Sequence, residues 1–96
     1  MSAWRLMHGD VELGRLTLSQ VDQPFFRCRF ERRPAFDSVA ELFAMELTSL
    51  NSGDMEQWEL NCARVDALSL VLTPEIGEPI EGFLLHVEGD EAWFRY

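Results

Sequence analysis

The stretch FFRCRFERRPAFDSVAELFAMELTSL, residues 25–50, decides the fold because its hydrophobic pattern changes period at Pro34. Over residues 25–33, apolar and charged side chains alternate, which is the period of a strand with one face in the core. Over residues 39–50, apolar side chains recur on nearly every face of a helix. The stretch therefore predicts a half-cationic strand followed by a helix that is buried on most sides.

Turn and cap residues predict the limits of two helices. Ser38 stands three residues before Glu41, which is the spacing of a capping box at a helix start. Gly53 can adopt the left-handed conformation that ends the first helix. Asp54 can then cap a second helix over residues 55–66. Two helices joined by so short a turn form an αα-hairpin.

The segments on either side of this region predict further strands. They lie at residues 4–8, 11–20, 68–73, 80–87 and 92–96. The Gly9-Asp10 pair suits a two-residue hairpin loop, and Gly14 is a candidate β-bulge. Strands joined by short turns run antiparallel, so the order βββ-αα-βββ predicts an α+β fold. We expect residues 1–96 to form a single globular domain, with a twisted or partly rolled antiparallel sheet and the αα-hairpin packed on one face.

The charge of the chain is unevenly distributed along the sequence. Through residue 33 there are six arginines and four acids, a net charge of +2, whereas residues 34–96 hold two arginines and thirteen acids, a net charge of −11. The total of −9 disfavours binding to nucleic acid and to an anionic membrane surface, because phosphate repels carboxylate. A polarised surface of this kind favours contacts with other proteins.

No motif predicts a catalytic, cofactor or metal site. The soft metal ligands are His8, Cys28, Cys62 and His86, and no two of them have the spacing of a zinc-binding pair. Both cysteines fall on apolar faces, so buried thiols in a reducing cytoplasm are the expectation. No apolar run is long enough to predict a membrane helix.

One group of residues is a candidate interaction surface. It comprises Phe25, Arg27, Arg29, Arg33, His86 and Trp93. Arginines interleaved with aromatic side chains can recognise anionic groups on a partner. The alternative is that these arginines pair with acids on neighbouring strands, since such cross-strand pairs are common and weak.

The sequence thus favours a small acidic, cytoplasmic module that binds a partner protein or associates with itself as a homodimer. An acidic inhibitor, an immunity-type protein or a nucleic-acid mimic would carry the same charge. A small-molecule-binding protein or minor enzyme, with a pocket between the helices and the sheet and using His86 or Glu41, is the alternative from a different class.

Overall fold

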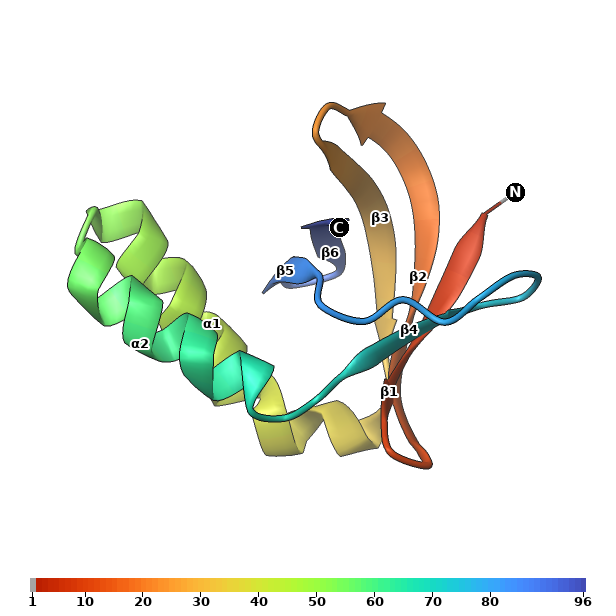
Figure 1. Cartoon of the computed structure of the whole chain (residues 1–96), viewed down its shortest axis with the longest axis horizontal. Helices are drawn as coiled ribbons and strands as arrows, with labels where there is room; N and C mark the ends of the chain where they lie inside the picture. The colour runs from red at the N-terminus through yellow and green to blue at the C-terminus, as the bar shows by residue number, and fades with distance from the viewer. Residues whose placement is uncertain (1) are drawn as a thin grey trace.

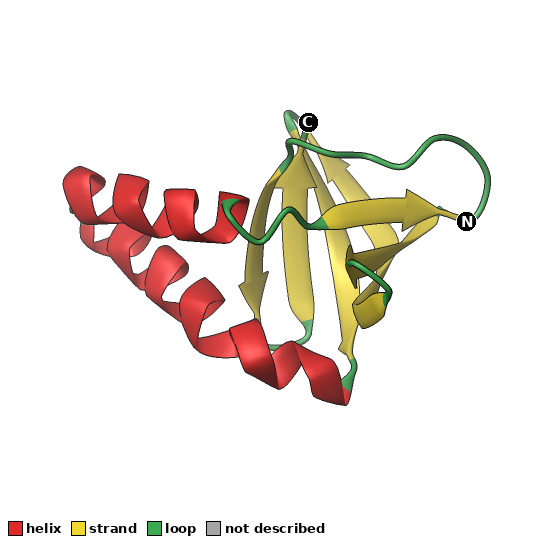
Figure 2. Cartoon of the chain, turned by 60° about the horizontal axis from the view of Figure 1, so that its bottom comes forward, coloured by secondary structure: helices red, strands yellow, loops and turns green. Residues whose placement is uncertain are grey.

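The computed structural model describes residues 2–96 and confirms the α+β fold with strands on both sides of a helical pair in the sequence (Figure 1). The elements are β1 (Ala3–His8), β2 (Val11–Asp22), β3 (Phe25–Arg32), a 3-10 turn (Pro34–Phe36), α1 (Asp37–Ser52), α2 (Met55–Asp66), β4 (Val71–Pro74), β5 (Leu84–Glu88) and β6 (Glu91–Arg95). All six strands join one antiparallel sheet in the order β4-β1-β2-β3-β6-β5. The sheet is curled, and the helical hairpin lies on one side of it, beside β5 (Figure 2).

The hydrophobic core lies between the curled sheet and the first turns of α1. Phe36 and Phe43 are each 1% exposed and stack with ring centroids 5.7 Å apart. Phe30 of β3 meets Phe36 edge-on at 5.0 Å. The alternation predicted for β3 is therefore correct, because its apolar face supplies Phe30 and Cys28 to this core.

A bulge in β2, in its pairing with β1, lies next to a close approach between β2 and β3. Leu6 lies opposite Gly14 and Met7 lies opposite Glu12, so Leu13 is the extra residue. The predicted bulge is thus confirmed, next to Gly14 rather than at it. A Cβ atom at Gly14 would lie 2.4 Å from the ring of Phe30, so any other residue here requires that ring to shift.

The helix ends agree with the prediction at the interhelical turn and differ at the start of α1. Gly53 has φ of 78°, and the Asp54 carboxylate accepts a hydrogen bond from the backbone N–H of Gln57 at 3.1 Å. Ser38 does not cap α1, because its hydroxyl donates to the carbonyl of Ala35 at 2.8 Å. The chain enters the helix through the 3-10 turn, so Ser38 already lies inside the first turn.

Both edges of the sheet are partly covered. Leu72 of β4 and Ile80 exchange two backbone hydrogen bonds of 3.0 and 2.8 Å across the outer side of β4. The predicted strand over residues 80–87 is therefore wrong at its start, and β5 begins at Leu84. At the other edge, α1 packs against β5. Within residues 2–96, neither helix is long and apolar enough to cross a membrane.

Candidate functional site

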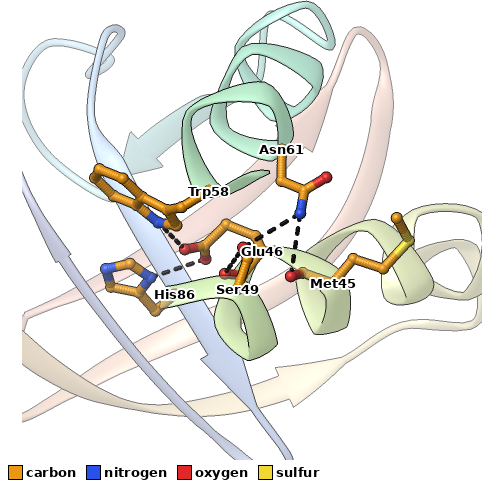
Figure 3. Close-up of polar contacts among 6 residues, drawn as sticks. All are labelled: Met45, Glu46, Ser49, Trp58, Asn61 and His86. Carbon is orange, nitrogen blue, oxygen red and sulfur yellow. Dashed lines mark hydrogen bonds and ion pairs between the residues drawn. The ribbon is translucent and has the colours of Figure 1, made fainter. Parts of the chain in front are cut away.

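Glu46 joins three elements of the fold through its buried carboxyl group (Figure 3). Its side chain is on α1 and is 1% exposed. The indole Nε1 of Trp58 on α2 donates to Oε2 at 2.7 Å, and Nδ1 of His86 on β5 lies 2.8 Å from Oε1. With the ring hydrogen of His86 on Nδ1, the carboxyl accepts from both side chains.

A second set of polar contacts fixes α2 on α1. Asn61, which is 1% exposed, donates through Nδ2 to the carbonyl of Met45 and to the hydroxyl of Ser49, both at 3.2 Å (Figure 3). Every buried side-chain nitrogen and oxygen atom within residues 2–96 has a partner. The two helices therefore meet through a satisfied hydrogen-bond network, where an apolar seam is the usual arrangement.

The Glu46–His86 pair has the chemistry of a carboxylate that orients a histidine base, and it is buried against aromatic side chains. The ring of His86 lies against Phe25 and Trp93, at centroid distances of 6.1 and 5.5 Å. Its side chain is 2% exposed, and no hydroxyl or thiol hydrogen-bonds to it within residues 2–96. The pair serves to hold α1 and α2 in position on β5.

Sequence reasoning missed Glu46. The helix was expected to be apolar nearly all round, with Glu46 among its few polar positions. Glu46 lies between Phe43 and Leu47 on the core side of the helix, and both of these neighbours are buried. This position in the helical pattern could have indicated that the carboxyl group is buried.

The structure brings four of the six residues of the candidate interaction surface together. His86 lies against both Phe25 and Trp93, and the guanidinium of Arg27 lies 5.3 Å from the centre of the Trp93 ring. His86 is buried beneath its neighbours, so it is not part of the accessible surface. Arg29 follows on the same face of β3, opposite Glu91.

The arginines of this surface are partly neutralised within the fold. Arg27 pairs with Asp22 at 3.0 Å. Arg33 pairs with Glu12 at 2.8 Å. Arg29 forms no ion pair within residues 2–96. Only part of the cationic strand is thus free for a partner.

The helical hairpin carries the opposite charge and keeps it exposed. Its exposed acids are Asp37, Glu41, Asp54, Glu56, Glu59 and Asp66. None of them forms an ion pair within the part of the chain that the structure describes. Met45, Met55 and Leu60 are 37, 47 and 53% exposed on the same hairpin. A groove of about 390 Å³ runs between the helices over Ala44 and Met45.

Neither cysteine has the properties of a nucleophile. Burial raises the pKa of Cys28 to about 12. Burial, followed by the charges of Glu46, Asp66 and Glu59, raises the pKa of Cys62 to about 11. Both thiols are therefore protonated at neutral pH. Within residues 2–96, no three His, Cys, Asp or Glu side chains converge to hold a metal ion.

Comparison with known proteins adds no assignment: no protein-family model, no curated protein and no solved structure matches the chain.

Proposed function

We propose that this protein is a protein-binding module whose acidic helical hairpin receives a basic segment of a partner protein. The observation that supports the proposal is that the hairpin's exposed carboxylates form no internal ion pair within residues 2–96 and share the hairpin with exposed apolar side chains. Over residues 37–66 there are seven acids and one arginine, a net charge of −6. Carboxylates that the fold leaves unpaired can steer a cationic partner and align it.

The groove between α1 and α2 can accommodate a short segment of a partner protein on this acidic surface. The residues that line it include the apolar Ala44 and Met45 and the acidic Glu41 and Asp54. A short segment with an apolar side chain between cationic ones matches this arrangement. The floor is rigid, because Asn61 and Ser49 are fixed by the hydrogen-bond network beneath it.

Self-association as a homodimer, the other form of the predicted binding module, has less support. The short strand β4 is partly covered by Ile80, and α1 packs on β5, so strand addition at either edge is hindered. Two hairpins facing each other would oppose like charges. A basic partner of a different sequence is therefore favoured over a second copy.

Titration of the ¹⁵N-labelled protein with an amphipathic Lys/Leu peptide tests the proposal. We expect saturable chemical-shift changes concentrated at residues 41–61. A Glu/Leu peptide of the same pattern should produce none, because its charge is repelled by the hairpin.

Two double variants with the same change in net charge separate a site from general attraction. E41Q/D54N removes the carboxylates of the groove, and asparagine still caps α2. D10N/E78Q removes two acids elsewhere. The first should weaken binding about fivefold or more, and the second less than about twofold. Equal effects of the two pairs, or shifts spread evenly over the protein, would show that the groove is not the binding site.

A further inference from the structure

A second cleft lies between α2 and the segment that leads into β5. Its volume is about 630 Å³, within the usual range of small-molecule sites. Its apolar lining comes from α2, through Trp58 and Val65, and from Leu70, Phe83 and Leu84. Its lining is therefore mainly apolar and includes two aromatic rings.

Three charged residues are among those that line the same cleft. Asp66 lies at the end of α2, Glu81 precedes β5, and Arg95 ends β6. None of the three forms an ion pair within residues 2–96, although both signs of charge are present. An apolar cleft bordered by unpaired acids and one unpaired guanidinium suits a ligand that carries both charges itself.

The indole of Trp58 is held in place before any ligand arrives. Its N–H is bound to the buried carboxyl of Glu46, which also binds His86 on the sheet. The ring therefore has little freedom to lose on binding, which favours affinity. The neighbouring thiol of Cys62 stays protonated, so the cleft is suited to binding rather than thiol chemistry.

We propose that this cleft binds a small zwitterion with an apolar side chain, such as a free aromatic amino acid or a dipeptide. Arg95 takes the carboxylate, Asp66 and Glu81 take the ammonium group, and Trp58 and Phe83 contact the apolar side chain. The proposal is independent of the partner-binding groove, which lies on a different part of the hairpin and shares none of these residues.

Calorimetric and ¹⁵N-shift titrations with four probes test this assignment. L-phenylalanine and Leu-Phe carry both charges, and their comparison distinguishes a free amino acid from a peptide. N-acetyl-L-phenylalanine keeps only the carboxylate, and L-phenylalanine amide keeps only the ammonium group. At least one zwitterion should bind, and loss of either charge should weaken binding about tenfold or more.

Charge-specific variants then assign each end of the ligand. R95Q should weaken the zwitterion and the acetylated probe while sparing the amide. D66N should weaken the zwitterion and the amide while sparing the acetylated probe. R64Q is the matched control, because Arg64 is exposed on α2 and does not line the cleft. The proposal is wrong if neither zwitterion gives saturable shifts up to about 10 mM, or if R95Q and R64Q have equal effects.

Discussion

Replacing Glu46 with leucine removes the only acceptor of two hydrogen bonds and should destabilise the fold by about 2–6 kcal/mol. The carboxyl accepts from Trp58 at 2.7 Å and from His86 at 2.8 Å. Leucine has a similar helix propensity and much of the same volume, so the loss of stability comes mainly from removing the carboxyl oxygens that accept these hydrogen bonds. Each donor left without a partner costs about 1–3 kcal/mol, and there are two.

A loss of this size is a large share of the stability of a small domain, which is about 5–15 kcal/mol in total. Urea unfolding followed by far-ultraviolet circular dichroism measures it, and this signal does not depend on the environment of Trp58. E41L is the matched control on the same helix. Because Glu41 is exposed, its replacement should change the free energy of unfolding by no more than about 0.5 kcal/mol.

Two further variants keep the reasoning testable if E46L is too unstable to study. E46Q retains one acceptor oxygen, and its amide group can donate to His86 if the ring hydrogen moves from Nδ1 to Nε2, so we expect a loss of only about 1 kcal/mol. W58F removes one of the two donors, so in that background E46L should cost about 1–3 kcal/mol less than in the natural sequence. If E46L changes the free energy of unfolding as little as E41L does, the carboxyl does not hold the three elements together. The same conclusion follows if E46L costs as much stability in the W58F background as in the natural sequence.

Three other predictions concern packing, capping and thiol reactivity. G14A should destabilise the protein by about 1–3 kcal/mol in urea unfolding, because the new methyl group overlaps the ring of Phe30, and F30L should relieve part of that cost. D54A should cost about 0.5–2 kcal/mol by the same measurement through loss of the N-cap, whereas D54N should be nearly neutral. In the folded protein, Cys62 should react with iodoacetamide at pH 8 about a hundredfold more slowly than in urea, because its pKa rises from 9.0 to about 11. Cys28, with a pKa of about 12, should react more slowly still. Equal rates in the folded and unfolded states would contradict both pKa assignments.

The parts of this fold that the sequence predicted correctly depend on local interactions. The alternation of β3 identifies its core face without reference to any other strand. Gly53 and Asp54 determine the interhelical turn through one left-handed residue and one side-chain hydrogen bond. Such features can be predicted because they depend on residues close in sequence, whatever the rest of the chain packs against them.

The parts that were missed depend on neighbours distant in sequence. Ser38 has the spacing of a cap, but burial of Phe36 draws the chain into a 3-10 turn before it. Residues 80–83 were predicted to continue the strand at 84–87, yet Ile80 pairs with β4 rather than extending β5. Glu46 has a buried role only because Trp58 and His86 reach it from other elements. A single sequence does not show such partners.

The charge pattern illustrates the same distinction and changes which surface is favoured for binding. In the sequence, the arginine-rich strand stands out, because half of all cations lie within residues 27–33. In the fold, Arg27 and Arg33 are paired with Asp22 and Glu12 within the sheet, which weakens their attraction for an outside anion. The exposed acids of the helical hairpin form no ion pair within residues 2–96. The hairpin, not the arginine strand, therefore retains the charge that the fold leaves unbalanced, and the candidate partner becomes a cation rather than an anion.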